Sequence, residues 1–262
     1  MNGMAVTRRQ AVLAGLTAAA LAACTRKTAT HVGAVAAPSP EATPSPATTA
    51  SSAGTAAPKT DGPATELVHG SRTGTAVALT FHGAGDPALG RSLLAEASRA
   101  GARVTVLAVG TWLEQNPDMA HAVLDGGHEL GNHTYTHPVL PDLDAAAAFT
   151  EIERCAAVLR RITGSAGTWF RPSGTPTATR TILTEAGRAG YAWSLSYDVD
   201  PRDYDDPGAD AVVARVKSAL QAGSVVSLHL GHAGTVAALP AILDDIHARG
   251  LTAVTASELL RP

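Results

Sequence analysis

The sequence has little cysteine, few aromatic side chains and almost no net charge. Its two cysteines are Cys24 and Cys155, and because Cys24 falls in a processing signal, a disulfide framework within one mature chain is excluded. Aromatic residues make up 4% of the 262 residues, so a surface that stacks on sugars would have to use few rings. The formal net charge of -3 leaves no basic footprint, and we therefore expect no nucleic-acid partner.

The first 23 residues have the layout of an export signal. Arg8 and Arg9, which resemble a twin-arginine signal, precede an apolar run over 11–23 that is too short to span a membrane comfortably. The run ends at Cys24 in a Leu-Ala-Ala-Cys sequence that resembles a bacterial lipoprotein processing site. Two acyl chains on Cys24 would anchor the protein stably. We expect an exported, lipid-anchored protein at the cell membrane that faces the cell wall or periplasm, with an ordinary cleaved signal or a short core helix as the alternatives.

A low-complexity segment follows the signal. Residues 24–71 are rich in Ala, Thr, Ser and Pro and show no apolar periodicity. Such a composition cannot bury enough apolar surface to offset the entropy lost on ordering. We predict a disordered tether over 24–71, semi-extended through its prolines, and one folded domain over 72–262.

Within this domain, short apolar runs alternate with longer Ala- and Leu-rich segments of helical spacing. Such alternation predicts parallel strands with covering helices, hence the α/β class. About seven units favour a distorted, incomplete (β/α) barrel over a full eight-fold one, and a doubly wound open sheet is the rival interpretation. The expected strands are 76–81, 103–109, 128–132, 168–171, 191–198, 224–230 and 251–254, and the expected helices are 87–100, 117–125, 143–162, 177–189, 209–222 and 236–248.

Histidine, aspartate and arginine side chains follow five of these predicted strands at the point where each ends. The carboxyl ends of parallel strands meet at one side of such folds, and this is where their functional sites gather. The clearest pair is His133 and His137, because residues four apart on a helical turn share one face and can chelate one ion. Two separate hydrogen-bonded histidines are the alternative.

The ordered set of motifs resembles the polysaccharide deacetylase family, carbohydrate esterase family 4, over residues 76–260. Residues 128–138, His-Glu-Leu-Gly-Asn-His-Thr-Tyr-Thr-His-Pro, match that family's histidine motif almost throughout. The segment 200–204 resembles its fourth motif with Tyr in place of Trp, and Leu228-His229 resembles its fifth. The resemblance implies a divalent metal, with zinc the expected ion, and removal of N- or O-acetyl groups from peptidoglycan or another surface polysaccharide.

The resemblance also implies roles for individual residues. His133 and His137 would hold the metal, and His229 would be the general acid that protonates the leaving amine. Leu228 would help line the pocket for the acetyl methyl group. The further candidates are Tyr204 and Ser173 for substrate binding and Asp200 for catalysis.

The first motif departs from the family pattern. Where the family has Thr-Phe-Asp-Asp-Gly, with one aspartate as general base and the next as metal ligand, this chain has Thr-Phe-His-Gly-Ala-Gly-Asp over residues 80–86. By direct alignment, His82 takes the position of the base. Gly83, which has no side chain, takes the position of the ligand.

Two repairs of the metal site are open. We predict that Asp86 turns back, because the glycines before it permit backbone turns that other residues resist, and becomes the third ligand with His82 beside the reacting water. In that case His82 could be the base, since an unperturbed imidazole pKa of about 6.5 suits neutral pH. Alternatively His82 ligates in a three-histidine site, which would suit zinc, and the base is one of three carboxylates: Asp86, Asp198 or Asp200.

The third motif is one residue shorter than the family's, reading Arg171-Pro-Ser-Gly. The family's arginine orients the catalytic carboxylate, and that partner loses its purpose beside a histidine, because a nearby cation disfavours imidazolium. We therefore predict that Arg171 pairs with Asp86, Asp200 or Asp203. His232 is a candidate extra ligand or proton shuttle.

The altered first motif leaves two other functions open. One is a degenerate relative that holds glycan or metal without catalysis. The other is a metal-dependent amidase that acts on a non-sugar C–N bond. Metal-dependent turnover would dismiss the first, and a panel of substrates would separate the second from a deacetylase.

Overall fold

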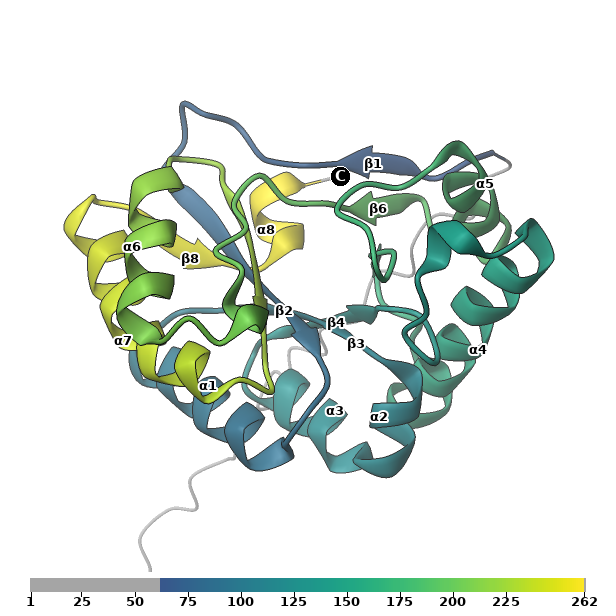
Figure 1. The fold of residues 1–262 in the computed structure, drawn as a ribbon, viewed down its shortest axis with the longest axis horizontal. Helices are drawn as coiled ribbons and strands as arrows, with labels where there is room; N and C mark the ends of the chain where they lie inside the picture. Colours follow the sequence, from purple (N-terminus) through teal and green to yellow (C-terminus); the bar gives the residue numbers. More distant parts are fainter. Residues whose placement is uncertain (1–61, 262) are drawn as a thin grey trace, which may run out of the picture. The chain divides into compact units, whose positions relative to one another are not determined.

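The computed structural model describes residues 62–261, in which eight strands form one parallel sheet surrounded by helices (Figure 1). The sheet order is β1-β6-β5-β4-β3-β2-β7, and β8 pairs with β2. The predicted signal peptide, Cys24 and residues 25–61 of the predicted tether lie outside the described residues. No helix of the described part is long and apolar enough to cross a membrane.

All seven predicted strands are present, and an eighth precedes them. The six predicted helices are also present, and α2 and α8 are additional short ones. The strands are β1 (Thr65–Leu67), β2 (Ala76–Gly83), β3 (Thr105–Ala108), β4 (Glu129–Asn132), β5 (Trp169–Phe170), β6 (Trp193–Leu195), β7 (Val225–His229) and β8 (Thr252–Val254). The helices are α1 (Pro87–Arg99), α2 (Gly110–Gln115), α3 (Pro117–Asp125), α4 (Ala145–Thr163), α5 (Arg180–Arg188), α6 (Ala209–Ala219), α7 (Ala233–Ala248) and α8 (Ala256–Leu260), with 3-10 turns η1 (Leu140–Asp142) and η2 (Asp203–Asp205).

The predicted α/β fold with a distorted, incomplete barrel is confirmed. β1 and β7 are the two ends of the hydrogen-bonded sheet order. After β6 the chain forms a single parallel bridge from Val199 to Val226 of β7, which brings the two sides together at that point. Parallel strands place all their carboxyl ends on one side, so the segments that follow them share one rim.

The boundary of the predicted tether is wrong for residues 62–71. β1 lies within this stretch and pairs with β6 along its whole length. The carboxylate of Glu66 accepts hydrogen bonds from the backbone N–H of Ala178 and from the hydroxyl of Ser196. A three-residue strand is too short to show periodicity, so only its pairing partner reveals it.

The alternation of β2 separates a helix-facing layer from the barrel interior. Val77, Leu79 and Phe81 are fully buried in the main core cluster, which includes side chains of α1, α3 and α7. Ala78 instead packs in a separate cluster with Leu107, Trp169 and Ala256 of α8. By the same period of two, the side chain of His82 points to the interior side. The interior is therefore filled with apolar side chains near α8 and carries a histidine at the opposite end.

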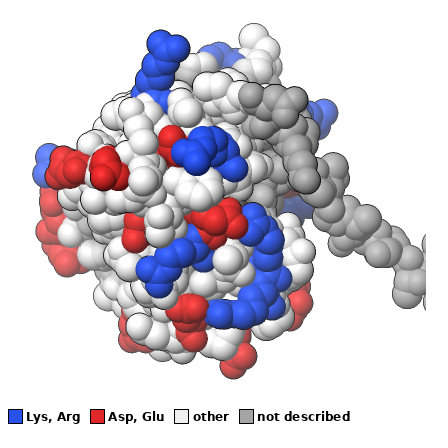
Figure 2. Space-filling model, turned by 90° about the vertical axis from the view of Figure 1, so that its right-hand side faces the viewer, with Lys and Arg blue, Asp and Glu red and all other residues white. Residues whose placement is uncertain are grey.

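Charged side chains on the surface are mixed in sign. Figure 2 shows one face, on which Lys and Arg lie beside Asp and Glu rather than in a patch of one sign. Several pairs involve α4 and α5, among them Arg160–Glu153 at 2.9 Å and Arg188–Glu185 at 2.5 Å. Exposed pairs such as Arg160–Glu153 contribute little stability, typically about 0–1 kcal/mol each, whereas Glu185 is itself buried.

Candidate metal centre

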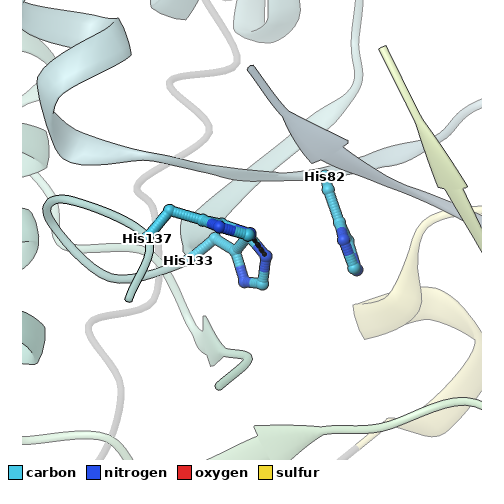
Figure 3. A group of neighbouring side chains, drawn as sticks. All are labelled: His82, His133 and His137. Carbon is cyan, nitrogen blue, oxygen red and sulfur yellow. Dashed lines mark hydrogen bonds between the residues drawn. The ribbon is translucent and has the colours of Figure 1, made fainter. Parts of the chain in front are cut away.

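Three imidazoles gather at the carboxyl ends of β2 and β4. One ring nitrogen from each of His82, His133 and His137 lies within 4.8 Å of the other two, and this is the group of described residues that could hold a metal ion. The rings of His82 and His133 have centroids 4.3 Å apart, and Nε2 of His133 lies 3.1 Å from Nε2 of His137. Figure 3 shows His133 and His137 side by side, with His82 projecting next to them from its strand.

The backbone between His133 and His137 is not helical, so the expectation of a shared helical face is wrong. Thr134 has φ 67° and His137 has φ 62°, both in the left-handed region that non-glycine residues seldom occupy. The side chain of Asn132 accepts a hydrogen bond from the backbone N–H of Thr134 at 2.8 Å. Two left-handed residues fold the loop back on itself, and this brings the two rings together without a helix.

Glu151 of α4 accepts hydrogen bonds from the loop that carries His133 and His137. One of its carboxylate oxygens accepts the backbone N–H groups of Tyr135 and Thr136, at 3.0 and 2.7 Å. The other accepts the Thr136 hydroxyl at 2.9 Å. No pattern in the sequence indicates this role for Glu151, since the spacing of a helix residue does not show that it turns toward a loop 15 residues earlier.

Ser173 holds the same loop from the other side and is not a substrate contact. It is fully buried, and its hydroxyl donates to the carbonyl of Pro138 at 2.5 Å. It also accepts a hydrogen bond from the hydroxyl of Thr134 at 3.0 Å. The prediction that Ser173 binds substrate is therefore wrong, because its side chain is buried and its hydroxyl is bonded to Pro138 and Thr134.

Two features of the imidazoles suit metal binding. Nδ1 of His133 lies 3.0 Å from the carbonyl oxygen of Arg171, so a proton on Nδ1 donates there and leaves the Nε2 lone pair free. Ligating histidines in proteins use this arrangement. Burial lowers the pKa of both His82 and His133 well below the ordinary value, and the neutral form is the one that ligates. The residues present therefore fit a divalent metal held by three histidines.

His229, at the end of β7, lies directly beside this group and is paired with a buried carboxylate. Its ring centroid is 4.4 Å from that of His82, and its Nδ1 lies 2.8 Å from Oδ1 of Asp203. The other oxygen of Asp203 accepts the backbone N–H of His229 and the hydroxyl of Thr235. Burial raises the pKa of Asp203, but the interactions with His229 and Thr235 outweigh burial and leave that pKa below its ordinary value. Asp203 is therefore a carboxylate that fixes the orientation of His229.

Asp86 does not join the histidines, so its prediction as third ligand is wrong. It is exposed, and its Oδ1 accepts the backbone N–H of Ala88 at 2.8 Å as the N-cap of α1. Pro87 follows it at the first helical position, where proline is favoured. A cap residue must point along its own helix, and this geometry turns the carboxylate away from the sheet interior. His82 takes the third place instead.

Gly83 also faces away from the site. A Cβ at Gly83 would lie 2.8 Å from Cγ1 of Val106 and 3.0 Å from Cα of Ala108. Val106 and Ala108 belong to the main, helix-facing core cluster. Because β2 continues through Gly83, a side chain there would enter this core rather than approach the imidazoles.

Arg171 is buried without a carboxylate, so none of the three predicted ion pairs is formed. Its Nε donates to the carbonyl of Leu195 at 2.8 Å, and its Nη2 lies 3.4 Å from the carbonyl of Ser196. Its Nη1 has no hydrogen-bond partner among the described residues. Burial lowers the pKa of Arg171 to about 9. Arg171 lacks a counterion, and the first motif has His82 and Gly83 where the family has two aspartates.

The comparisons with known proteins agree with this geometry. Residues 69–193 match the family model described as polysaccharide deacetylase. A peptidoglycan-N-acetylglucosamine deacetylase of Bacillus cereus is 32% identical over 195 residues, which cover 71% of this chain and 88% of that protein. The chain belongs to the polysaccharide deacetylase family.

Solved structures of this family share the fold. A family 4 carbohydrate esterase from Streptomyces lividans, in complex with acetate, is 30% identical and superposes with a TM-score of 0.63, covering 68% of this chain and 91% of that one. A family pseudoenzyme from Bacillus anthracis is 22% identical with a TM-score of 0.70, covering 74% and 68%. The second likeness shows the fold alone.

Leu228 and Tyr204, two further positions suggested by the family motifs, lie in different surroundings. Leu228 is fully buried in the main core cluster and pairs in register with Phe81, so it faces the helices and does not line the site. The alternation of β7 instead places Ser227 on the interior side, with its hydroxyl 3.3 Å from Nε2 of His82. Tyr204 is 43% exposed, and its ring lies edge to face with His229 at 5.2 Å.

The carboxylates suggested as bases lie outside the histidine group. Asp198 accepts hydrogen bonds from Arg72, Ser224 and the backbone of Val225. Asp200 is exposed, and its Oδ1 accepts the backbone N–H of Arg202 at 2.8 Å. Asp198 is thus fully used in holding the loop, whereas Asp200 keeps one oxygen without such a bond among the described residues.

Proposed function

We propose that this member of the polysaccharide deacetylase family is a metal-dependent hydrolase that removes acetyl groups from a cell-wall or surface polysaccharide. The observation that carries the proposal is the gathering of His82, His133 and His137 beside the His229–Asp203 pair. These are a metal-binding group and a proton donor, the two components that acyl hydrolysis of this kind needs. The Bacillus cereus relative bears the name of a peptidoglycan deacetylase, which supports the glycan as substrate.

The three histidines would hold the metal. An all-imidazole group suits zinc, and a divalent ion bound there would polarise the acetyl carbonyl and lower the pKa of water. The group contains no carboxylate among the described residues. Of the predicted bases, Asp86 is turned away as the cap of α1 and Asp198 is bonded through both oxygens, so Asp200 is the remaining candidate.

His229 acts as the general acid in this proposal. Asp203 binds its Nδ1, which fixes the tautomer and leaves Nε2 as the nitrogen that exchanges a proton with substrate. The proton on Nε2 is then given to the leaving nitrogen or oxygen. Tyr204, exposed beside His229, offers a ring on which a sugar could stack.

We further propose export and lipid anchoring, which rest on the sequence alone. The arginine pair Arg8-Arg9, the apolar run and Cys24 support a lipoprotein signal, and residues 25–61 support a tether to a glycan outside the membrane. Mass spectrometry of the mature protein should find an N-terminus at a diacylated Cys24. Recovery of Cys24→Ala in the membrane fraction at the level of the wild type would contradict the anchor.

The enzymatic proposal is tested by acetate release. The protein is stripped with a chelator, reloaded with zinc or cobalt, and given acetylated chito-oligosaccharides or peptidoglycan fragments. We expect release that requires the metal and falls by about 10²-fold or more in His229→Gln, the range for loss of a general acid. Equal release by the stripped and reloaded proteins would refute metal dependence.

A second function, glycan binding without turnover, is favoured by a specific observation. Gly83 faces the helices and Arg171 has no carboxylate, so the carboxylates of the family's first motif have no equivalent in the histidine group. Calorimetry with chito-oligosaccharides would then show binding, while no acetate appears with any added metal. Metal-dependent acetate release excludes this second function.

A further inference from the structure

A second aspartate–histidine pair lies next to the first. Oδ1 of Asp206 is 2.8 Å from Nδ1 of His232, the same distance and the same pair of atoms as in Asp203–His229. Both pairs join residues 26 apart in the sequence. The β6–α6 segment thus supplies two carboxylates and the end of β7 supplies two imidazoles, each three residues apart.

The two pairs differ in their exposure. The side chains of His229 and Asp203 are 21% and 0% exposed, whereas those of His232 and Asp206 are 28% and 71% exposed. The rings of His229 and His232 have centroids 5.7 Å apart, and His229 lies 4.4 Å from His82. His82, His229 and His232 therefore form a row that leads from the metal-binding group to the solvent-exposed carboxylate of Asp206.

The backbone is shaped to form this outer pair. Asp206 has φ 50° at the end of η2, in the left-handed region that costs free energy for a residue with a side chain. His232 is the N-cap residue of α7 but makes no side-chain capping bond, so its ring is not engaged with the helix. The ring is bound by Asp206 instead. Gly231 packs tightly on the β2–α1 loop, where a Cβ would lie 2.9 Å from the carbonyl oxygen of Ala84, and this contact places His232 beside the site.

His232 is outside the metal-binding group. That group, searched over the described residues, contains His82, His133 and His137. The structure therefore gives no support to His232 as an extra ligand. Its neighbour is His229, the proposed general acid.

We propose that the His232–Asp206 pair returns protons to His229 during turnover. The proposal rests on the proposed deacetylase function and adds a residue to it. When His229 gives the proton on Nε2 to the leaving nitrogen or oxygen, its imidazole becomes neutral and must be reloaded. His232 gives its Nε2 proton to His229, directly or through one water molecule, and then takes one proton from solvent. One proton thus enters at His232 for each proton that leaves at His229, and Asp206 holds the ring of His232 in place through its Nδ1.

The proposal makes His232 a residue that acts through His229, so its removal should slow turnover without weakening binding. We expect His232→Gln to lower kcat about 10-fold, less than the range of about 10²–10⁴ for loss of a general acid. KM and the bound metal should not change. Asp206→Asn should give a smaller loss in the same direction. A hindered pyridine buffer, which carries protons but coordinates metals poorly, should restore the kcat of His232→Gln as its concentration rises.

The control is His247→Gln, an exposed histidine on the last turn of α7, whose kcat should equal that of the wild type in every buffer. A His232→Gln variant with unchanged kcat would refute the relay while leaving the deacetylase proposal intact. A loss of kcat that no buffer restores, or a loss expressed as higher KM, would assign His232 to substrate binding instead. Absence of acetate release by the metal-loaded wild type refutes the proposed function, and the relay with it.

Discussion

The carboxyl ends of β4 and β2 both supply histidines to the group that could hold a metal but are built in opposite ways. After β4, the loop that carries His133 and His137 donates hydrogen bonds to Asn132 and Glu151 and accepts one from Ser173. β2 ends at Gly83, and the first carboxylate after it, Asp86, serves as the cap of α1. One strand end matches the family's histidine motif and is held by hydrogen bonds, and the other has neither aspartate of the family's first motif.

This difference changes the charge of the site. Two acidic positions of the family's first motif are filled here by a neutral imidazole and a glycine, and Arg171 remains as a buried cation. A metal held by three neutral ligands keeps its full charge, whereas an aspartate ligand would offset part of it. We therefore expect substitutions of the histidines at the end of β4 to weaken metal binding most. We expect an aspartate introduced at Gly83 not to restore the family's carboxylate ligand.

The largest effect on zinc affinity is expected at the end of β4, which matches the family's histidine motif. His133→Ala removes a ligand whose ring is oriented by the Arg171 carbonyl. Loss of a mere supporting contact costs about 10–100-fold in metal affinity, so loss of the ligand should exceed that. Titration with a zinc indicator measures the effect. His121→Ala, an exposed histidine of α3, is the control, and equal zinc affinity of the two variants would contradict the assigned site.

At the other strand end, restoring an aspartate is expected to fail. Gly83→Asp places a Cβ 2.8 Å from Val106 Cγ1 and drives a carboxylate into the helix-facing core. Overpacking costs about 1–3 kcal/mol, and the buried charge adds to it. Urea unfolding should show this loss, and zinc affinity should not rise. The matched control is Gly74→Asp, where the nearest atom to the new Cβ is 3.8 Å away. A stable Gly83→Asp protein with tighter zinc binding would show that β2 can end earlier.

A smaller effect is expected from the support of the histidine loop. Glu151→Gln keeps one acceptor oxygen but loses the charge that binds the N–H groups of Tyr135 and Thr136. We expect zinc affinity to fall by about 10-fold, at the low end for outer contacts of a metal site. Glu153→Gln, on the same helix and paired with Arg160, should leave it unchanged. If both variants bind zinc as the wild type does, the loop holds its shape without α4.

The smallest effect concerns Glu129, at the start of β4 and far from the rim. Burial raises the pKa of Glu129, against hydrogen bonds from Ser257, Thr105 and Trp169. Because the folded-state pKa lies above the ordinary value of 4.5, its contribution to stability is fully present below that value. It is lost as pH rises through the folded pKa. The difference in unfolding free energy between the wild type and Glu129→Gln should therefore shrink from pH 4 to pH 7, and a difference that grows over this range would contradict the shift.

Much of the fold was predictable because strands and helices of this domain carry strong periodic patterns. The predicted helix 117–125 has the bounds of α3, and each predicted strand overlaps an observed one. The histidine pair was predictable because both residues lie in one continuous motif, residues 128–138. β1 was missed because its pairing with β6 joins residues about 130 positions apart, which no local pattern records.

The errors in the site share one cause. The position of Asp86, Leu228 and Ser173 along the chain does not reveal where their side chains point, because that direction depends on where a strand ends or a helix begins. Asp86 caps a helix, Leu228 points to the helices, and Ser173 bonds the histidine loop. Asp203 and Glu151 gain their roles from partners 26 and 16 positions away.

The sequence by itself determined the residues available: histidines at the ends of β2, β4 and β7, with no aspartate at positions 82 and 83. It also determined the α/β alternation that brings strand ends to one rim. Only the tertiary structure decided that His82 rather than Asp86 joins His133 and His137, and that each of His229 and His232 meets its own aspartate. The physical reason is that strand alternation and helix capping set the direction of a side chain, and direction decides which groups come within hydrogen-bond or metal-ligand distance.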